Sequence, residues 1–410
     1  MDNVKIGFLT TANISTANGY VTRILEELTQ LHRKKISVSI LSFLHIKYWK
    51  NKAGISNYVE TIKDFGNNIS VIPVFPDNQN PILYKALDQY CVWQIRRFLR
   101  KEHISVLHCQ ATLSAYLGVL AVTDSKLPVV YDMHGAEIAE QADRWEWASF
   151  AMKRLEQTER IAALGSNTVI AVSKALREHM MMKYPGMSPA SFIIPCAVNT
   201  EKLIFNPSER VKLRSSWNVS DSAPIFVCLG SAVAYQKIDQ SLQVFQQVQV
   251  SFPDARMLLL SPQTDIGIIK KIARELGIKD GSLLFYSVTH NEVAAYLSAC
   301  DFGFLLRDNL LLNNVSSPTK FGEYISCGVP VILSPYISDL SFLVDQYKVG
   351  IVFEEDLKKL ISFVRYVMNN RDELRRNCID YAFNNYSWDY YGDYLLKAYG
   401  STIHNLSDGL

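Results

Sequence analysis

Residues 315–334 read VSSPTKFGEYISCGVPVILS, a stretch that combines a short helix with an apolar strand. Ser316 or Ser317 is suited to cap the helix, and Pro318 to open its first turn. Gly328 is expected to end the helix before the run VPVILS. The stretch therefore predicts one helix-and-strand unit of an α/β sheet.

The first turn of this helix is suited to receive an anion. Its unpaired backbone N–H groups and the positive end of the helix dipole favour phosphate groups. Lys320 adds a full charge, and Glu323 lies three residues later, where its carboxylate is placed to accept hydrogen bonds from ribose hydroxyls. The alternative is a capped helix whose Lys320 and Glu323 only pair with each other in solvent.

Short apolar runs followed by helical stretches recur along the whole chain. VKIGFLT, ISVSILSF, NISVIPVF, ISVLHC, PVVYDMH and TVIAVS precede residue 200, and PIFVCLG, ARMLLLS, GSLLFYS, CDFGFLL and VPVILS follow it. This alternation predicts parallel sheets wrapped by helices. A chain of 410 residues exceeds one ordinary core, so we expect an α/β protein with two doubly wound, Rossmann-like domains. The pattern does not assign residues 43–69.

Charge and cysteine usage narrow the function class. The formal net charge of +2 does not indicate a nucleic-acid partner. Two basic runs, HRKK at 32–35 and RRFLRK at 96–101, are either solvated helix faces or a contact with an anionic membrane. Seven scattered cysteines without zinc spacing, and no apolar run of about 18 residues, favour a cytoplasmic protein that is at most peripherally associated with the inner face of a membrane.

The pattern S-P-x-K-x-x-E-Y-x-x-x-G-x-P-V-I, which starts at Ser317, resembles the nucleotide-binding segment of glycosyltransferase family 4. Members of that family have the GT-B fold and transfer sugars from nucleotide diphosphates with retention of configuration. The resemblance implies that Glu323 binds the ribose and that Lys320 lies near the diphosphate. It also implies that Ser317 and Thr319 help to cradle phosphate and that Pro318 lies among the donor-binding residues.

Two segments of the first half extend the resemblance. The small-residue loop ending in Asn18-Gly19 looks like the family's first strand-to-helix turn, which approaches the donor phosphates, and Gly19 permits that approach. VVYDMHGAEIAE resembles the strand end that bears an active-site histidine, which implicates His134 and, as sugar or acceptor contacts, Asp132 and Glu137. Without the resemblance, a histidine at a strand end is more often a packed or capping residue.

Two departures from the family pattern concern the donor site. Ser231 replaces an arginine after the glycine that opens the second domain, which leaves Lys237 as a phosphate partner. Val315 replaces a glutamate that contacts the sugar. Nearby polar residues could take over these contacts, namely Arg307, Asp308, Asn313 and Asn314.

The resemblance also suggests the domain limits. We expect an acceptor-side domain at residues 1–203 and a nucleotide-sugar domain at 204–385, facing each other across a cleft. We expect residues 386–400, which include YSWDYYGDYLLKAY, to form a closing helix that packs back on the first domain, and residues 401–410 to form a flexible tail.

The predicted activity is sugar transfer from a UDP- or GDP-linked donor to a glycan or lipid-linked acceptor. Lys320, Lys237 and the helix N-terminus would stabilise the departing diphosphate, while His134 would orient the sugar. No D-x-D sequence is present, so we expect no metal, and no cofactor besides the donor substrate. The alternatives are a non-catalytic GT-B protein and a nucleotide-sugar epimerase, whereas a dehydrogenase is disfavoured because no G-x-G-x-x-G follows a strand.

Overall fold

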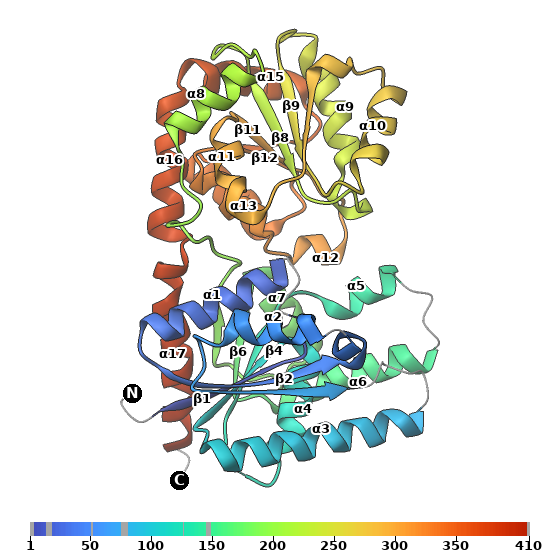
Figure 1. Ribbon diagram of the computed structural model, residues 1–410, viewed down its shortest axis with the longest axis vertical. Helices are drawn as coiled ribbons and strands as arrows, with labels where there is room; N and C mark the ends of the chain where they lie inside the picture. Colours follow the sequence, from blue (N-terminus) through green and yellow to red (C-terminus); the bar gives the residue numbers. More distant parts are fainter. Residues whose placement is uncertain are drawn as a thin grey trace. The chain divides into compact units, whose positions relative to one another are not determined.

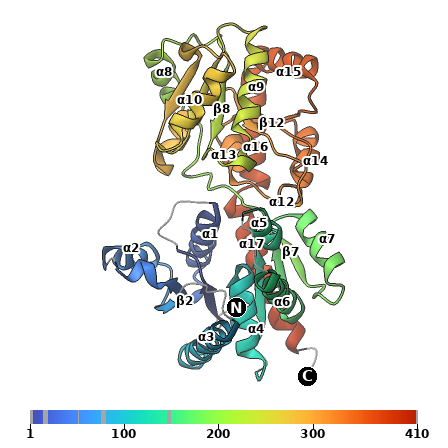
Figure 2. The same cartoon turned by 90° about the vertical axis from the view of Figure 1, so that its right-hand side faces the viewer.

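A computed structural model describes residues 4–13, 19–50, 52–74, 81–125, 127–144 and 149–407. The chain divides into two compact units, of which unit 1 comprises Met1–Cys196 with Tyr391–Leu410, and unit 2 comprises Ala197–Tyr390. Each unit is a parallel sheet with helices on both faces (Figures 1 and 2). The predicted α/β class with two doubly wound domains is confirmed.

Unit 1 contains a seven-stranded sheet in the order β3-β2-β1-β4-β5-β6-β7. Its strands are β1 (Lys5–Thr10), β2 (Ser37–His45), β3 (Asn68–Val74), β4 (Val106–Gln110), β5 (Val129–Met133), β6 (Thr168–Ala171) and β7 (Ser191–Ile193). Its helices are α1 (Gly19–Arg33), α2 (Lys52–Ile62), α3 (Pro81–Glu102), α4 (Ala111–Val122), α5 (Glu137–Arg144), α6 (Ser149–Gly165), α7 (Lys174–Lys183) and most of α17 (Trp388–Ser407), with the 3-10 turn η1 at Ile46–Lys50. The stretch that the pattern left unassigned thus holds the end of β2, η1 and α2. Among the described residues, no helix has the length and apolar character needed to cross a membrane.

Strand β4 shows how the sheet of unit 1 sends side chains to two different layers. Its Cys109 packs on α4 at Gly118, where an added Cβ would lie 2.6 Å from the sulfur. His108 and Gln110 point the other way, because successive side chains of a strand alternate between faces. On that side His108 contacts Tyr399 of α17, and Gln110 contacts Glu27 of α1. These two helices cover this face of the sheet, and the layer between them and the sheet is polar.

Unit 2 contains a six-stranded parallel sheet in the order β10-β9-β8-β11-β12-β13. Its strands are β8 (Ile225–Leu229), β9 (Arg256–Leu260), β10 (Leu283–Tyr286), β11 (Phe302–Leu305), β12 (Val331–Leu333) and β13 (Gly350–Val352). Its helices are α8 (Pro207–Ser216), α9 (Ile238–Gln249), α10 (Ile266–Glu275), α11 (Val293–Ser298), α12 (Leu311–Asn314), α13 (Thr319–Ser326), α14 (Ser338–Tyr347), α15 (Leu357–Asn369) and α16 (Arg371–Asn385), with 3-10 turns at Ala234–Gln236 (η2), Asp280–Ser282 (η3) and His290–Glu292 (η4).

The order of the strands in unit 2 reverses between β8 and β11. Ligands of doubly wound sheets bind beyond the carboxyl ends of the strands at such a reversal. The two cores of this unit lie on opposite faces, since Ile225 and Val227 of β8 join one core and Phe226 and Cys228 the other. The reversal therefore lies in the middle of the sheet, where both of its faces are covered by a core.

The boundary between the units differs from the predicted one at residue 203. Val198 and Leu203 belong to the core of unit 2, and the backbone of Val198 pairs with Ser387. The segment after β7 therefore joins unit 2 at Ala197.

Helix α17 corrects the prediction of a flexible tail from residue 401. The helix continues to Ser407, and Thr402 is fully buried, with its hydroxyl donating to the Thr168 hydroxyl of β6 at 2.8 Å. Tyr399 of the same helix contacts His108 of β4. The helix is therefore anchored in unit 1 one turn farther than the pattern predicted, and only residues 408–410 of the expected tail lie outside the described residues.

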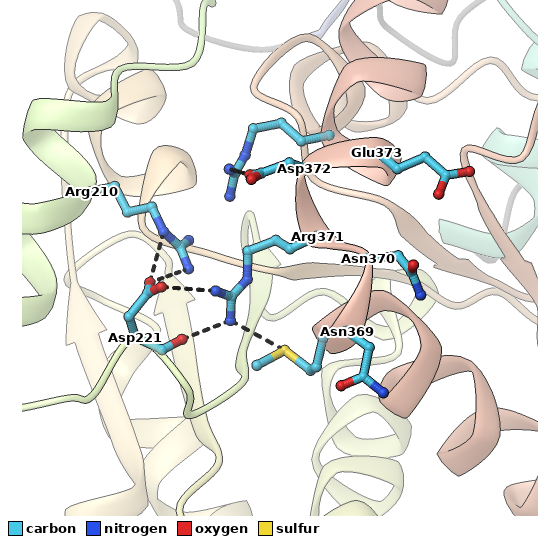
Figure 3. Close-up of a pocket in the computed structure, with 9 residues that line it drawn as sticks. Arg210, Asp221, Asn369, Asn370, Arg371, Asp372 and Glu373 are labelled. Carbon is cyan, nitrogen blue, oxygen red and sulfur yellow. Dashed lines mark hydrogen bonds and ion pairs between the residues drawn. The ribbon is translucent and has the colours of Figure 1, made fainter.

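A buried ionic cluster joins α8, β8, β11 and α16 in unit 2. The fully buried carboxylate of Asp301 lies 2.9 Å from the Arg210 guanidinium, 3.2 Å from Arg214 and 3.0 Å from Arg371, and it accepts a hydrogen bond from the Ile225 N–H at 2.9 Å. The exposed Asp221 pairs with Arg210 and Arg371 at the rim of a cavity (Figure 3). Because these arginines are already paired with carboxylates, we interpret the cluster as structural.

Candidate active site

The predicted anion-binding helix is α13, which begins at Thr319 with Pro318 as the preceding cap residue. The expectation that Ser316 or Ser317 caps it is wrong, because Pro318 occupies the cap position and makes no side-chain hydrogen bond there. The Ser316 hydroxyl instead donates to the Asn313 carbonyl at 2.8 Å, and the Ser317 hydroxyl lies 3.3 Å from that of Tyr386. The two serines therefore stabilise the segment that leads into the helix. The prediction that Gly328 ends the helix is confirmed, since the φ of Gly328 is +71°.

Lys320 lies on this helix and shares a partner, which is distant in the sequence, with a second cation. The Lys320 ammonium is 2.5 Å from Oε1 of Gln236, and the Arg307 guanidinium donates to the same oxygen at 2.8 Å. Gln236 ends the turn after β8, and Arg307 follows β11, so the two elements at the strand reversal meet here. Neither cation forms an ion pair with a carboxylate within the part of the chain that the structure describes. Two positive groups thus share one neutral acceptor.

The electrostatics of this pair favour an incoming anion. Burial, together with the Arg307 charge, lowers the pKa of Lys320 to about 7. Burial likewise lowers the pKa of Arg307. A negatively charged ligand would relieve both effects, because an opposite charge stabilises the protonated forms.

Gly230 at the end of β8 makes room for Lys320. Its φ is +115°, and a Cβ added there would lie 2.5 Å from the Lys320 nitrogen. Any side chain at this position would therefore displace the lysine, quite apart from the backbone strain. Gln236 was not expected at the site, since no sequence motif distinguishes it from a surface glutamine.

Glu323 lies one turn along α13 and is partly buried. Burial raises the pKa of its carboxyl to about 7, against an opposing effect of Lys320. No hydrogen bond to the carboxylate is made by the residues that the structure describes. Thr319 is the first residue of the same helix. That Glu323 and Thr319 bind the donor remains a prediction.

The other polar residues predicted around the donor are tied to one another. Lys237, whose φ is +50°, forms an ion pair with Asp308 at 3.1 Å. Asn313 is buried, and its amide donates to the Asp308 carbonyl at 3.0 Å. The Asn314 amide donates to Asn309 at 3.0 Å, while its buried oxygen has no partner in the described part of the chain. Asn313 thus supports the loop itself, so the prediction that it contacts the sugar is not favoured.

In unit 1, His134 follows β5 and is about 10% exposed. Its Nε2 lies 3.1 Å from Asp132 and 2.6 Å from Oε1 of Gln110, and the ring of Tyr20 packs on it at 4.4 Å. The side chain is therefore held from one edge, and only a small part of it is open.

Asp132 is a support for His134 and not the expected sugar contact. It is fully buried, and Arg23 binds both of its oxygens, at 2.8 and 3.0 Å. Burial alone would raise the pKa of Asp132, but Arg23 and His134 hold it well below its ordinary value. Because the carboxylate is fully buried, the prediction that it contacts the sugar is not favoured.

Glu137 opens α5 and accepts a hydrogen bond from the Thr112 N–H at 3.0 Å. Burial raises the pKa of its carboxyl. Gly19 is the first residue of α1, while the loop that was predicted to approach phosphate, up to Asn18, lies outside the described residues. Glu137 and Gly19 remain predicted contacts.

Sequence reasoning missed the buried polar layer beneath His134. Arg23 also lies 3.1 Å from Glu27, one helical turn away on α1, and donates to the carbonyl of Ile194 at 2.7 Å. The spacing of Arg23 and Glu27 was the only local signal, and it is shared by many exposed helix pairs. In the described residues, Glu27, His108 and Asp132 also form a group whose ligand atoms lie within 4.8 Å of one another, as a metal ion would require. In this structure the Arg23 guanidinium is the cation that contacts both carboxylates of this group, Glu27 and Asp132.

The fold and the two sites define a class of protein. Two doubly wound units, one of which holds Lys320 and Arg307 at its strand reversal, are the architecture of GT-B glycosyltransferases. The family description "Glycosyltransferase Family 4" matches residues 17–202, and "Glycosyl transferases group 1" matches residues 209–385. The chain therefore belongs to the GT-B glycosyltransferases related to family 4, as the sequence pattern predicted.

Solved structures agree on the fold. A glycosyltransferase from Rickettsia africae is 14% identical, with a TM-score of 0.73 over 98% of this chain and 100% of that one. HepE of Anabaena, in complex with UDP, is 13% identical with a TM-score of 0.71 over 97% and 100%. Sucrose-phosphate synthase of Thermosynechococcus elongatus is 15% identical with a TM-score of 0.70 over 97% and 98%. No curated protein matches the sequence.

Proposed function

We propose that the protein transfers a sugar from a UDP- or GDP-linked donor to a glycan or glycolipid acceptor, with retention of configuration and without a metal ion. The observation that carries this proposal is the pair of cations, Lys320 and Arg307, that share Gln236 and form no ion pair with a described carboxylate. A diphosphate matches their charge. HepE has been solved with UDP and with UDP-glucose, which supports a donor of this chemical class.

Breaking the bond between sugar and diphosphate develops negative charge on the departing phosphate. Fixed donors near that oxygen lower the barrier most, because they need no reorganisation during the reaction. In this proposal Lys320, Arg307 and the N-terminus of α13 are those donors, and Glu323 holds the ribose. Arg307, expected as a sugar contact, thus contacts phosphate in this proposal and replaces the family's arginine, for which this chain has Ser231.

The test is an assay of the purified protein with UDP- and GDP-sugars and candidate acceptors. Release of free nucleotide diphosphate that depends on acceptor, with the product anomer identified by NMR, is the expected result. Donor turnover to an isomerised sugar without acceptor would instead support an epimerase. Nucleotide binding without any turnover would support a non-catalytic protein.

We predict that EDTA leaves sugar transfer largely unchanged. The physical reason is that two side-chain cations and backbone N–H groups neutralise the diphosphate where other enzymes use a divalent ion. The measurement compares initial rates before and after chelation and dialysis. Complete loss of activity that magnesium or manganese restores would contradict the mechanism.

We predict that His134→Ala lowers kcat about tenfold while the dissociation constant of UDP or GDP changes little, as expected for an interaction made mainly in the transition state. The reason is that His134 is proposed to act on the sugar and not on the nucleotide. Calorimetry with the nucleotide diphosphate gives the dissociation constant, and circular dichroism checks the fold. If the folded variant no longer bound nucleotide, the role of His134 would be wrong.

We propose that α3 supplies a peripheral contact with an anionic membrane. Its exposed face carries Tyr90 and Trp93, which are 38% and 51% exposed, and the basic residues Arg97, Arg100 and Lys101. Arg97 lies over the Trp93 ring at 5.9 Å. Aromatic and basic side chains together suit the interface of an anionic bilayer.

We predict that Arg100→Ala weakens binding to vesicles of phosphatidylcholine with phosphatidylglycerol about fivefold, because each basic residue near such a surface contributes roughly 1 kcal/mol. Co-sedimentation measures the bound fraction. The matched control is Lys279→Ala, which removes an exposed charge from unit 2. Equal losses in both variants, or equal binding to pure phosphatidylcholine, would rule out this face.

A further inference from the structure

One buried amide connects the two histidines of the polar layer in unit 1. Oε1 of Gln110 lies 2.6 Å from Nε2 of His134. Its amide nitrogen lies 2.5 Å from the Glu27 carboxylate and 2.6 Å from Nε2 of His108. Gln110 is fully buried at the end of β4, so water does not compete for these contacts.

The neighbours of His134 determine which of its nitrogens is protonated. Asp132 is an ionised carboxylate that Arg23 binds through both oxygens, so it can only accept a hydrogen bond. Nε2 of His134, at 3.1 Å from that carboxylate, must therefore carry the proton. In the neutral ring, Nδ1 is then unprotonated.

The same constraint orients the amide. Gln110 must turn its oxygen to the N–H of His134, and its NH₂ group then points at Glu27 and His108. The reversed amide would place NH₂ against the N–H of His134 and oxygen against the carboxylate of Glu27, which are two repulsive contacts.

His108 is consequently held in the opposite tautomer. Its Nε2 accepts from the Gln110 amide, so its proton lies on Nδ1, where the Tyr399 hydroxyl oxygen accepts it at 2.9 Å. The ring stacks on Phe8 at a centroid distance of 4.8 Å, which keeps these two edges in register.

We propose that Gln110 is a positioning residue that sets the proton of both histidines, so that neutral His134 presents Nδ1 as an acceptor for a hydroxyl group of the transferred sugar. The role of the sugar in this inference rests on the proposed function, but the tautomers of His134 and His108 are a property of the protein without substrate. No described residue hydrogen-bonds Nδ1 of His134, whereas its other nitrogen has two partners. A sugar hydroxyl that donates to Nδ1 completes the ring's hydrogen bonding.

The first experiment measures the tautomers in the full-length protein without substrate. Nitrogen-15 NMR of histidine-labelled protein distinguishes protonated from unprotonated ring nitrogens, and spectra of His134→Ala and His108→Phe assign the two rings. We expect the neutral form of His134 to be protonated at Nε2 alone and His108 at Nδ1 alone. A proton on Nδ1 of neutral His134, or on Nε2 of His108, would overturn the proposal.

The second experiment replaces the amide with an apolar side chain of similar length. In Gln110→Met, Nε2 of His108 loses its donor, and the Glu27 carboxylate, an acceptor, lies 3.5 Å from it. We therefore expect the His108 proton to move to Nε2, with the Tyr399 hydroxyl at 2.9 Å then donating to Nδ1. We expect kcat for transfer to fall about tenfold, the value of one well-placed hydrogen bond, while UDP or GDP affinity is retained. The matched control, Gln249→Met at the end of α9, removes a partly exposed amide that donates to the Ala255 carbonyl and should change neither readout.

The outcomes separate the two proposals. A folded Gln110→Met protein with an unchanged His108 spectrum or an unchanged kcat would refute the positioning role. If the wild-type protein transferred no sugar at all, the proposed function would fail, whereas the NMR spectra would still decide how Gln110 arranges the protons.

Discussion

Replacing Asp301 with alanine is expected to lower the free energy of unfolding by about 3–5 kcal/mol, the cost of removing one partner from a buried ion pair. Asp301 is the fully buried centre of this ionic cluster, and it faces Arg210, Arg214 and Arg371. Without it, these guanidinium groups lose their buried counter-charge, and the Ile225 N–H loses its acceptor. Urea denaturation followed by circular dichroism measures the loss.

The matched control for this substitution is Asp221→Ala. Asp221 pairs with Arg210 and Arg371 as well, but 71% of its side chain is exposed. Ion pairs at the surface contribute about 0–1 kcal/mol, because water screens them and the side chains lose entropy. Equal destabilisation by the two substitutions would show that burial of Asp301 is not what matters.

Replacing Lys320 with alanine is expected to lower kcat/KM at sub-saturating donor about tenfold to a hundredfold. The lost interaction is a charge-assisted bond to the diphosphate, which contributes roughly 1.5–3 kcal/mol. Gln236→Leu is a useful companion, since it removes the shared acceptor but leaves both cations. Unchanged kinetics in Lys320→Ala would exclude this residue from the donor site.

The pH dependence of nucleotide binding provides a second check on Lys320. Because the folded protein holds its pKa at about 7, the charged fraction falls as the pH rises through 7, and the affinity for UDP or GDP should fall with it. The diphosphate favours the charged form, so binding at pH 8 should take up a proton from the buffer. Calorimetry in two buffers of different ionisation enthalpy measures this uptake, which Lys320→Ala should abolish.

Much of the donor helix could be read from its sequence. Pro318 directly precedes the first residue of α13, and Gly328 directly follows its C-cap residue Cys327, because backbone conformation at helix ends depends on local side chains. The capping serines were nevertheless assigned wrongly. Their hydroxyls bind Asn313 and Tyr386, and the second of these lies 69 residues away.

The alternation of apolar runs and helical stretches also predicted two parallel sheets, because strands that helices cover on both faces are mostly apolar. It did not predict the end of the chain. Residues 401–407 have no strong apolar period, yet Thr402 is buried because its hydroxyl meets Thr168 on β6. A polar residue at a tail position thus contributes to packing that only the folded sheet creates.

The sequence by itself determined the class of fold, the family and the helix that carries Lys320 and Glu323, since these depend on residues close together in the chain. The tertiary structure decided that Arg307 joins Lys320 through Gln236, and that Asp132 serves Arg23 and His134. The partners in these contacts lie 71 and 109 residues apart. They meet because the order of strands brings the ends of β8 and β11 together, and α1 onto β5, and no local pattern encodes that order.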